Sequence, residues 1–80
     1  MTNETQTYYI DPDTGVYTSV AVMEIKTRRN RLLYESDWTQ LPNGPLSFEL
    51  QTAWAAYRQQ LRDIPTQSGF PTDVVWPERP

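Results

Sequence analysis

One apolar stripe in the second half of the chain constrains the fold more than any other feature. Large apolar side chains recur there at spacings of four, three, four and three residues, and they are Leu50, Trp54, Tyr57, Leu61 and Ile64. This spacing is typical of one face of an α-helix. Ser47 is a good N-cap, and Pro65 ends the run. The pattern predicts a helix over roughly residues 48–63, whose apolar face other parts of the chain must cover.

A second helix is predicted before a connection that contains two prolines. Apolar residues of the segment 20–35 fall near one helical face, and they are Val22, Ile25, Leu32 and Leu33. Thr18 or Ser19 is suited to cap its start. The β-branched residues at Val20 and Val22 disfavour a helix there, so continuation of a preceding strand to about Val22 is an alternative. In the connection, residues 36–45, we expect Trp38 and Leu41 to act as apolar anchors.

The first part of the chain has the pattern of a β-hairpin. Aromatic and β-branched residues at 7–10 and 16–18 flank the turn-forming sequence Asp11-Pro12-Asp13-Thr14-Gly15. Proline presets φ, aspartate side chains bond nearby backbone donors, and Gly15 can take a positive φ. The pattern predicts a hairpin with a loop of three to five residues. Because a lone hairpin is marginal in water, it has to rest on the remaining chain or on another chain.

These elements predict a small α+β domain. An N-terminal β-hairpin precedes a helical hairpin, and the extended C-terminal tail packs on it through Phe70, Val74 and Trp76. We expect a hairpin module at residues 1–25 and a helical region at 26–80. Apolar residues make up only 38% of the chain, but three Trp, five Tyr and two Phe supply large side chains for a core.

The composition leaves little for catalysis. The chain has no Cys and no His, which removes disulfides, thiolate metal sites and the commonest general base. Its serines therefore lack a histidine base, and Asp13-Thr14-Gly15, the tripeptide of aspartic proteases, occurs once, where it suits a turn. We expect no catalytic residue, no cofactor and no metal site.

Four of the seven positive charges lie within six residues, at Lys26, Arg28, Arg29 and Arg31. One interpretation is a solvated helix face paired with Glu24 and Glu35 at i,i+4 spacing. Another is a surface for an acidic protein, and a third is contact with nucleic acid. The net charge of −3 makes nucleic acid the weakest of the three.

The three tryptophans have two interpretations. They can form a core, with Trp54 on the helix and the other two brought in from flanking segments. Alternatively, Trp38 or Trp76 anchors a partner protein, as aromatic hot spots do. Together with the basic cluster, this gives four candidate partner-binding residues, which are Trp38, Trp76, Arg28 and Arg29.

No targeting or membrane segment is apparent. The longest apolar run near the N-terminus is the four residues 20–23. A signal peptide needs a longer apolar region, and a spanning helix needs about 20 residues. We therefore expect a soluble protein that stays where it is made.

Three sequence motifs are specific in combination. They are Asp37-Trp38-Thr39-Gln40-Leu41-Pro42, Trp54-Ala55-Ala56-Tyr57-Arg58-Gln59-Gln60-Leu61-Arg62-Asp63-Ile64-Pro65, and Trp76-Pro77. With them, the sequence from about Arg28 to Pro80 resembles the phage tail assembly chaperone family of tailed bacteriophages. It departs from the family at Asn30, where an acid is usual, at Tyr34, where Ala is usual, and at Asn43, where Asp is common.

The resemblance implies a role but no catalytic residue. It implies that Trp54 and Tyr57 face the preceding helix, and that Arg58, Asp63 and Asp37 hold a turn by charge-assisted bonds. The implied function is that of a non-enzymatic phage protein that binds a tail or tail-fibre protein and assists its assembly in the host cytoplasm. The alternative is a structural component of the tail, baseplate or fibre in the virion. Homo-oligomerisation stays open, and a nucleic-acid-binding regulator is a distant third.

Overall fold

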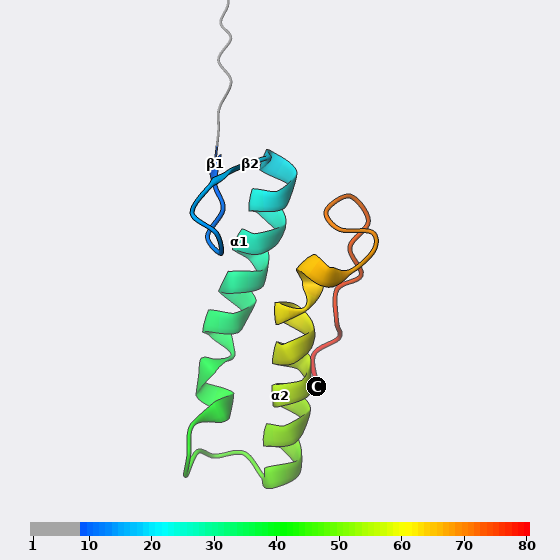
Figure 1. Ribbon diagram of the computed structural model, residues 1–80. Helices are drawn as coiled ribbons and strands as arrows, with labels where there is room; N and C mark the ends of the chain where they lie inside the picture. The colour runs from blue at the N-terminus through cyan, green and yellow to red at the C-terminus, as the bar shows by residue number, and fades with distance from the viewer. Residues whose placement is uncertain (1–8) are drawn as a thin grey trace, which may run out of the picture.

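The computed structural model describes residues 9–80 as a small α+β protein, as the sequence predicts (Figure 1). A two-stranded antiparallel hairpin leads into two helices that lie side by side. Its elements are β1 (Tyr9–Ile10), β2 (Tyr17–Thr18), α1 (Val20–Glu35), the 3₁₀ helix η1 (Asp37–Gln40), α2 (Phe48–Arg62) and the 3₁₀ helix η2 (Ile64–Thr66). The strand residues expected at 7 and 8 lie outside the described residues.

The hairpin has the turn that its sequence predicts. Tyr9 pairs with Thr18, and Ile10 pairs with Tyr17. The backbone N–H of Asp11 then donates to the carbonyl of Val16 at 2.8 Å, so residues 12–15 form the tip. Gly15 has a φ of 75°, which glycine adopts without steric cost.

The first helix begins earlier than the β-branched residues suggested. The helix expected over residues 20–35 is confirmed, and the alternative of a strand that continues to about Val22 is wrong, because β2 ends at Thr18 and α1 spans Val20–Glu35. Ser19 is the N-cap, and its Oγ accepts from the N–H of Val22 at 3.2 Å. The cap supplies a partner for one of the unpaired N–H groups of the first turn, which outweighs the small propensity penalty of two valines. A division at residue 25 falls inside α1, and the two-module organisation stays a prediction.

Of the two apolar anchors expected in the connection, Trp38 packs against Trp54 of the core, with ring centroids 6.3 Å apart, but neither it nor Leu41 is buried. Trp38 and Leu41 are 46% and 55% exposed, whereas Thr39 between them is fully buried. The Oγ1 of Thr39 donates to the carbonyl of Ser36 at 2.6 Å and accepts from Nε2 of Gln40 at 3.1 Å. Both polar groups of this buried side chain are thus satisfied. The main buried anchor is therefore a threonine hydroxyl rather than an apolar side chain.

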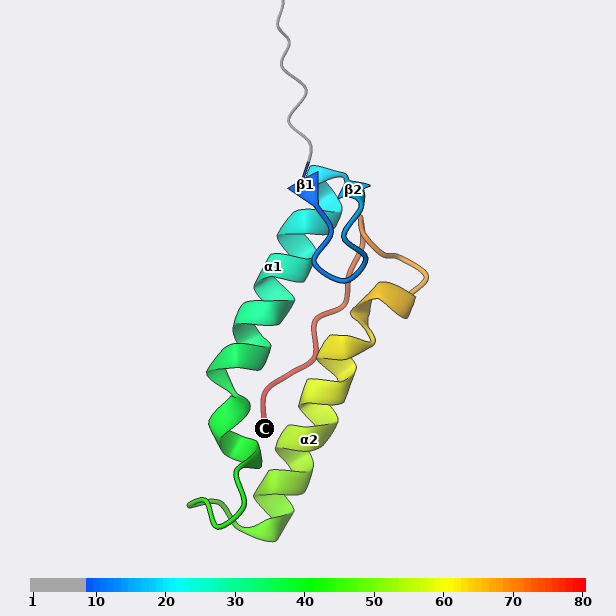
Figure 2. The ribbon, with the colours of Figure 1, turned by 60° about the vertical axis from the view of Figure 1, so that its left-hand side comes forward.

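The predicted apolar stripe of α2 forms the core except at its start, where the expectation for Leu50 is wrong, because that side chain is 46% exposed and lies outside the core cluster. Trp54, Tyr57 and Leu61 are buried there with Ile64 of η2, and the rings of Trp54 and Tyr57 meet edge to face with centroids 5.5 Å apart. Partly buried side chains from α1, the segment before α2 and the tail cover this stripe, and they are Ile25, Leu32, Leu33, Leu46, Phe70, Val74 and Trp76. The expected return of the tail onto the helices is confirmed, and Figure 2 shows it running between α1 and α2.

Candidate partner-binding surfaces

Two members of the basic cluster are used inside the molecule. The Nζ of Lys26 lies 2.8 Å from Oδ2 of Asp11 and 3.0 Å from Oδ2 of Asp13. Arg29 donates from Nη1 and Nη2 to the two carboxylate oxygens of Asp13 at 3.0 and 2.9 Å. Lys26 and Arg29 are only 6% and 5% exposed. For these two residues the interpretation as a solvated face is wrong, because they fasten the hairpin tip to α1.

The pKa values of this cluster reflect the pairing. Hydrogen bonding to Lys26 lowers the pKa of Asp11. Hydrogen bonding to Arg29, and then to Lys26, lowers the pKa of Asp13 from 3.8 to about 2. Burial acts to lower the pKa of Lys26, but its bonds to Asp11 and Asp13 outweigh burial and raise it. All three groups are therefore charged at neutral pH, so the ion pairs between the hairpin and α1 are maintained under those conditions.

The other two members stay at the surface. Arg31 lies within 4.0 Å of Glu35, the i,i+4 pair that the sequence predicted, and both side chains are mostly exposed. Arg28 instead lies over the ring of Trp76, with the guanidinium carbon 4.1 Å from the ring centroid. This cation–π contact joins α1 to the tail. A second one, Arg79 over Trp54 at 5.4 Å, joins the end of the tail to α2.

Arg58 of α2 closes the end of α1. Its Nη1 donates to the carbonyl of Leu33 at 2.6 Å and to Oγ of Ser36 at 2.7 Å, and its Nη2 donates to Oδ1 of Asp37 at 2.7 Å. The roles that the resemblance implied for Arg58 and Asp37 are thus confirmed. Asp63 differs, because its exposed carboxylate accepts from Nε2 of Gln59, one helical turn earlier, and within residues 9–80 it holds no turn between segments.

A set of exposed apolar side chains lies at the end of the molecule where the connection joins the two helices. We name this set the connection patch, and it comprises Trp38, Leu41, Phe48 and Leu50, which are 46%, 55%, 79% and 46% exposed. Trp38 also packs against Trp54 of the core, and the centroids of the two rings lie 6.3 Å apart. One face of its ring is therefore fixed from behind while the rest is open to a partner. The sequence signal for Phe48 is a large apolar residue off the core stripe, whereas Leu50 lies on that stripe and no feature of the sequence indicates its exposure.

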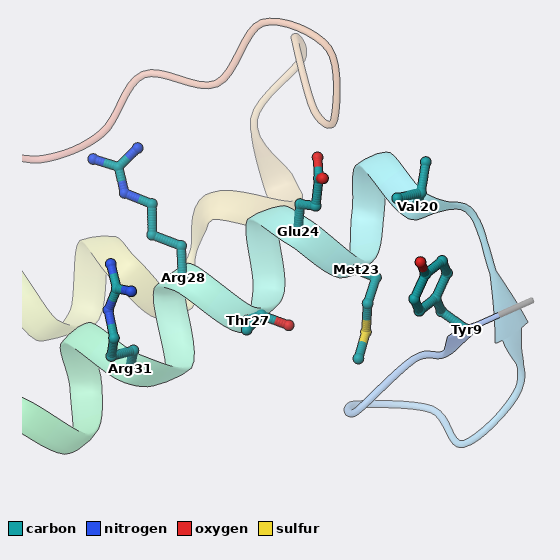
Figure 3. A pocket seen from close by; sticks show the side chains of 7 residues that line it. All are labelled: Tyr9, Val20, Met23, Glu24, Thr27, Arg28 and Arg31. Carbon is teal, nitrogen blue, oxygen red and sulfur yellow. The ribbon is translucent and has the colours of Figure 1, made fainter.

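A hollow lies on the outer face of α1, beside the hairpin. It has a volume of about 400 Å³, and Figure 3 shows the side chains around it, which are Tyr9, Val20, Met23, Glu24, Thr27, Arg28 and Arg31. Its hairpin end is apolar, and its far end is basic. No feature of the sequence alone indicated this hollow, because Tyr9 meets α1 only when the hairpin has docked.

The four predicted partner-binding residues differ in what a partner can reach. Trp38 is half exposed, Trp76 is partly buried beneath Arg28, and Arg28 itself is exposed. Arg29 is buried in the ion pairs with Asp13. Partner contact stays a prediction for all four, and the structure gives Trp38 and Arg28 the most accessible positions among them.

Two further searches of residues 9–80 concern other kinds of site. No three His, Cys, Asp or Glu side chains in this part of the chain are grouped so as to hold a metal ion. No helix within it has the length and apolar character needed to cross a bilayer.

Comparison with protein families decides the relationship. Residues 22–80 match the family model described as "Phage tail assembly chaperone protein". The chain belongs to this phage tail assembly chaperone family. The match covers α1 from its third residue, the connection, α2 and the tail, so the core and the connection patch are parts of the family domain. No curated protein and no solved structure gives a significant match.

Proposed function

We propose that this chaperone-family protein is a non-enzymatic binding protein that holds a phage tail or tail-fibre protein through the connection patch and assists its assembly. The observation that carries the proposal is the patch itself, four of the ten large apolar side chains that residues 9–80 leave exposed, all of them within the connection or the first turn of α2. Large apolar side chains left exposed near one end of a small protein are typical of a partner site. The family match supports the tail as the source of the partner.

In the proposed mechanism the protein covers apolar surface of its partner and catalyses no reaction. An unassembled tail or fibre protein exposes apolar surface that becomes buried in the finished particle, and such surface aggregates when it stays open. Trp38, packed against Trp54 on one side, offers a rigid aromatic anchor, which costs little conformational entropy on binding. Phe48 and Leu41 extend the apolar contact around it. Assembly in the host cytoplasm follows from a role before the particle is complete.

Co-expression tests the proposal. Each tail and tail-fibre protein of the same phage is expressed with the wild-type chain and with the Phe48→Ser or Leu41→Ser variant. We expect one of these proteins to stay soluble and co-purify with the wild type, and its affinity to fall by about tenfold in each variant. Val75→Ser is the matched control, because Val75 is 73% exposed but lies in the tail. Equal binding by all variants would contradict the role of the connection patch.

A second candidate is a structural component of the virion, supported by the hairpin. The sheet has only two strands in the part of the chain described, so each strand has one outer edge to which a neighbouring strand can add. Ile10 and Val16 are 49% and 60% exposed beside it. Mass spectrometry of purified particles separates the candidates. A stoichiometric copy number favours the structural component, and presence in infected-cell lysate alone favours the chaperone.

A further inference from the structure

The apolar and charged groups on the outer face of α1 are arranged so that one end of this face complements the other end. They would match if a second α1 lay antiparallel to the first. The central residue of this face is Thr27, which is exposed. Val20 and Tyr34 lie seven residues from it in opposite directions. Glu24 precedes it by three residues and Arg31 follows it by four, so opposite charges lie on either side of the centre. At 3.6 residues per turn, all five positions share one face of the helix.

The shape of this face changes along its length. Near the hairpin it is concave, because Tyr9, Val20 and Met23 surround the apolar end of the 400 Å³ hollow (Figure 3). Near the connection it is convex, because Tyr34 is 79% exposed and stands out from the helix. A protruding ring, that of Tyr34, and an apolar hollow therefore occur at opposite ends of one helix face.

We propose that this face binds a second copy of the chain, with the two α1 helices antiparallel and crossing at Thr27. In that arrangement the ring of Tyr34 from each copy enters the hollow at Tyr9, Val20 and Met23 of the other. Each Glu24 meets the other copy's Arg31, so two equivalent ion pairs form. Such a surface is self-complementary, which is the requirement of a two-fold interface.

The length of α1 and the charges on its outer face both fit a second copy of the chain as the partner. The 16 residues of α1 span about 24 Å, enough for several turns of contact between antiparallel helices packed at a shallow angle. Arg31 is available, because its Nε lies 4.0 Å from Oε2 of Glu35, too far for a hydrogen bond, and its side chain is 66% exposed. An acidic partner helix would leave Glu24 facing like charge, whereas a second copy supplies the opposite charge at each position.

Charge reversal tests the proposal on the full chain. We measure the dimer dissociation constant by sedimentation equilibrium over roughly 5 to 500 µM, since a contact of one helix per copy is smaller than a standard interface. Glu24→Arg and Arg31→Glu each convert two attractive pairs into two repulsive pairs, so each variant alone is expected to dimerise about tenfold more weakly. Arg62→Glu makes the same charge change as Arg31→Glu at an exposed site on α2 and should dimerise like the wild type.

Mixing gives the decisive result. When the Glu24→Arg chain is mixed with the Arg31→Glu chain, every cross-pair is attractive again, and a heterodimer of wild-type affinity should form. Tyr34→Ala, which alters no charge, should weaken association independently. The proposal is overturned if the wild type sediments as a monomer throughout, if the single variants dimerise like the wild type, or if the mixture stays as weak as its components.

Discussion

Arg58 of α2 donates through Nη2 to Oδ1 of Asp37 at 2.7 Å while its Nη1 holds the carbonyl of Leu33 and the hydroxyl of Ser36. One guanidinium thus binds both the end of α1, where the carbonyl of Leu33 also accepts from the N–H and Oγ of Ser36, and the first residue of η1. The Arg58 side chain is only 9% exposed, whereas that of Asp37 is 62% exposed. The two partners therefore differ in what their loss would cost, because Arg58 loses buried or part-buried bonds to Leu33 and Ser36, whereas Asp37 loses one bond at an exposed side chain.

The Arg58→Ala substitution should destabilise the protein strongly. It removes three charge-assisted hydrogen bonds and the packing of a buried side chain, so we expect the free energy of unfolding to fall by about 3 kcal/mol. Urea unfolding followed by tryptophan fluorescence measures it. Asp37→Asn is the matched control, because it keeps an oxygen acceptor at an exposed site and should cost less than about 1 kcal/mol. Equal losses for the two variants would show that the buried bonds contribute little.

Acid should weaken the ion pairs that join the hairpin to α1. The pKa of Asp13 is lowered from 3.8 to about 2 by its bonds to Arg29 and Lys26, and that of Asp11 is lowered chiefly by Lys26. A carboxylate whose pKa is lowered by folding stabilises the native state fully above its unfolded pKa and loses that effect as pH falls towards the folded pKa. We therefore expect stability to decline as pH falls from roughly 5 to 2.

Thermal unfolding across that pH range provides the check. A variant with both Asp11→Asn and Asp13→Asn should be less stable than the wild type at pH 7 and should show a flatter decline in acid, because the groups responsible are gone. A decline as steep as that of the wild type would mean that other carboxylates cause the acid sensitivity.

The turn that returns the tail to the helices depends on Gly69. A Cβ added there would overlap the backbone carbonyl of Asp73, whose N–H donates to the carbonyl of Gly69 at 2.6 Å. Backbone cannot move aside as a flexible side chain can, so Gly69→Ala should cost about 1–3 kcal/mol. Gly15→Ala provides the comparison, because Gly15 has a strained φ of 75° for alanine but open space around it, and its cost should be about 1 kcal/mol. The same urea titration ranks them, and the reverse order would contradict the role of the turn.

The parts of the fold that sequence predicts well are those set by neighbours along the chain. The period of Leu50 to Ile64 and the cap at Ser47 predict α2 nearly to its ends, since both signals lie within the element itself. The start of α1 was less certain, because valine propensity and the Ser19 cap favour different structures there. The cap prevails in the structure, as weak propensities often yield to a specific bond.

The surfaces were harder to predict, because they depend on packing between distant segments. Lys26 and Arg29 look like surface charges until the hairpin brings Asp11 and Asp13 beside them, 15 and 16 positions earlier in the chain. Likewise, nothing local distinguishes the exposed Trp38 from the buried Thr39 next to it. Only the docking of η1 against α2 decides which of the two faces outwards.

The central claim is that the connection patch binds a phage tail or tail-fibre protein. Hydrogen exchange measured on the complex tests this claim most directly. The chain is labelled alone and with the tail or tail-fibre protein that co-purifies with it, and amide protection is compared by segment. The account predicts slower exchange over residues 38–50 in the complex, with the hairpin tip at residues 11–16 unchanged. Unchanged exchange over residues 38–50, with protection elsewhere, would contradict it.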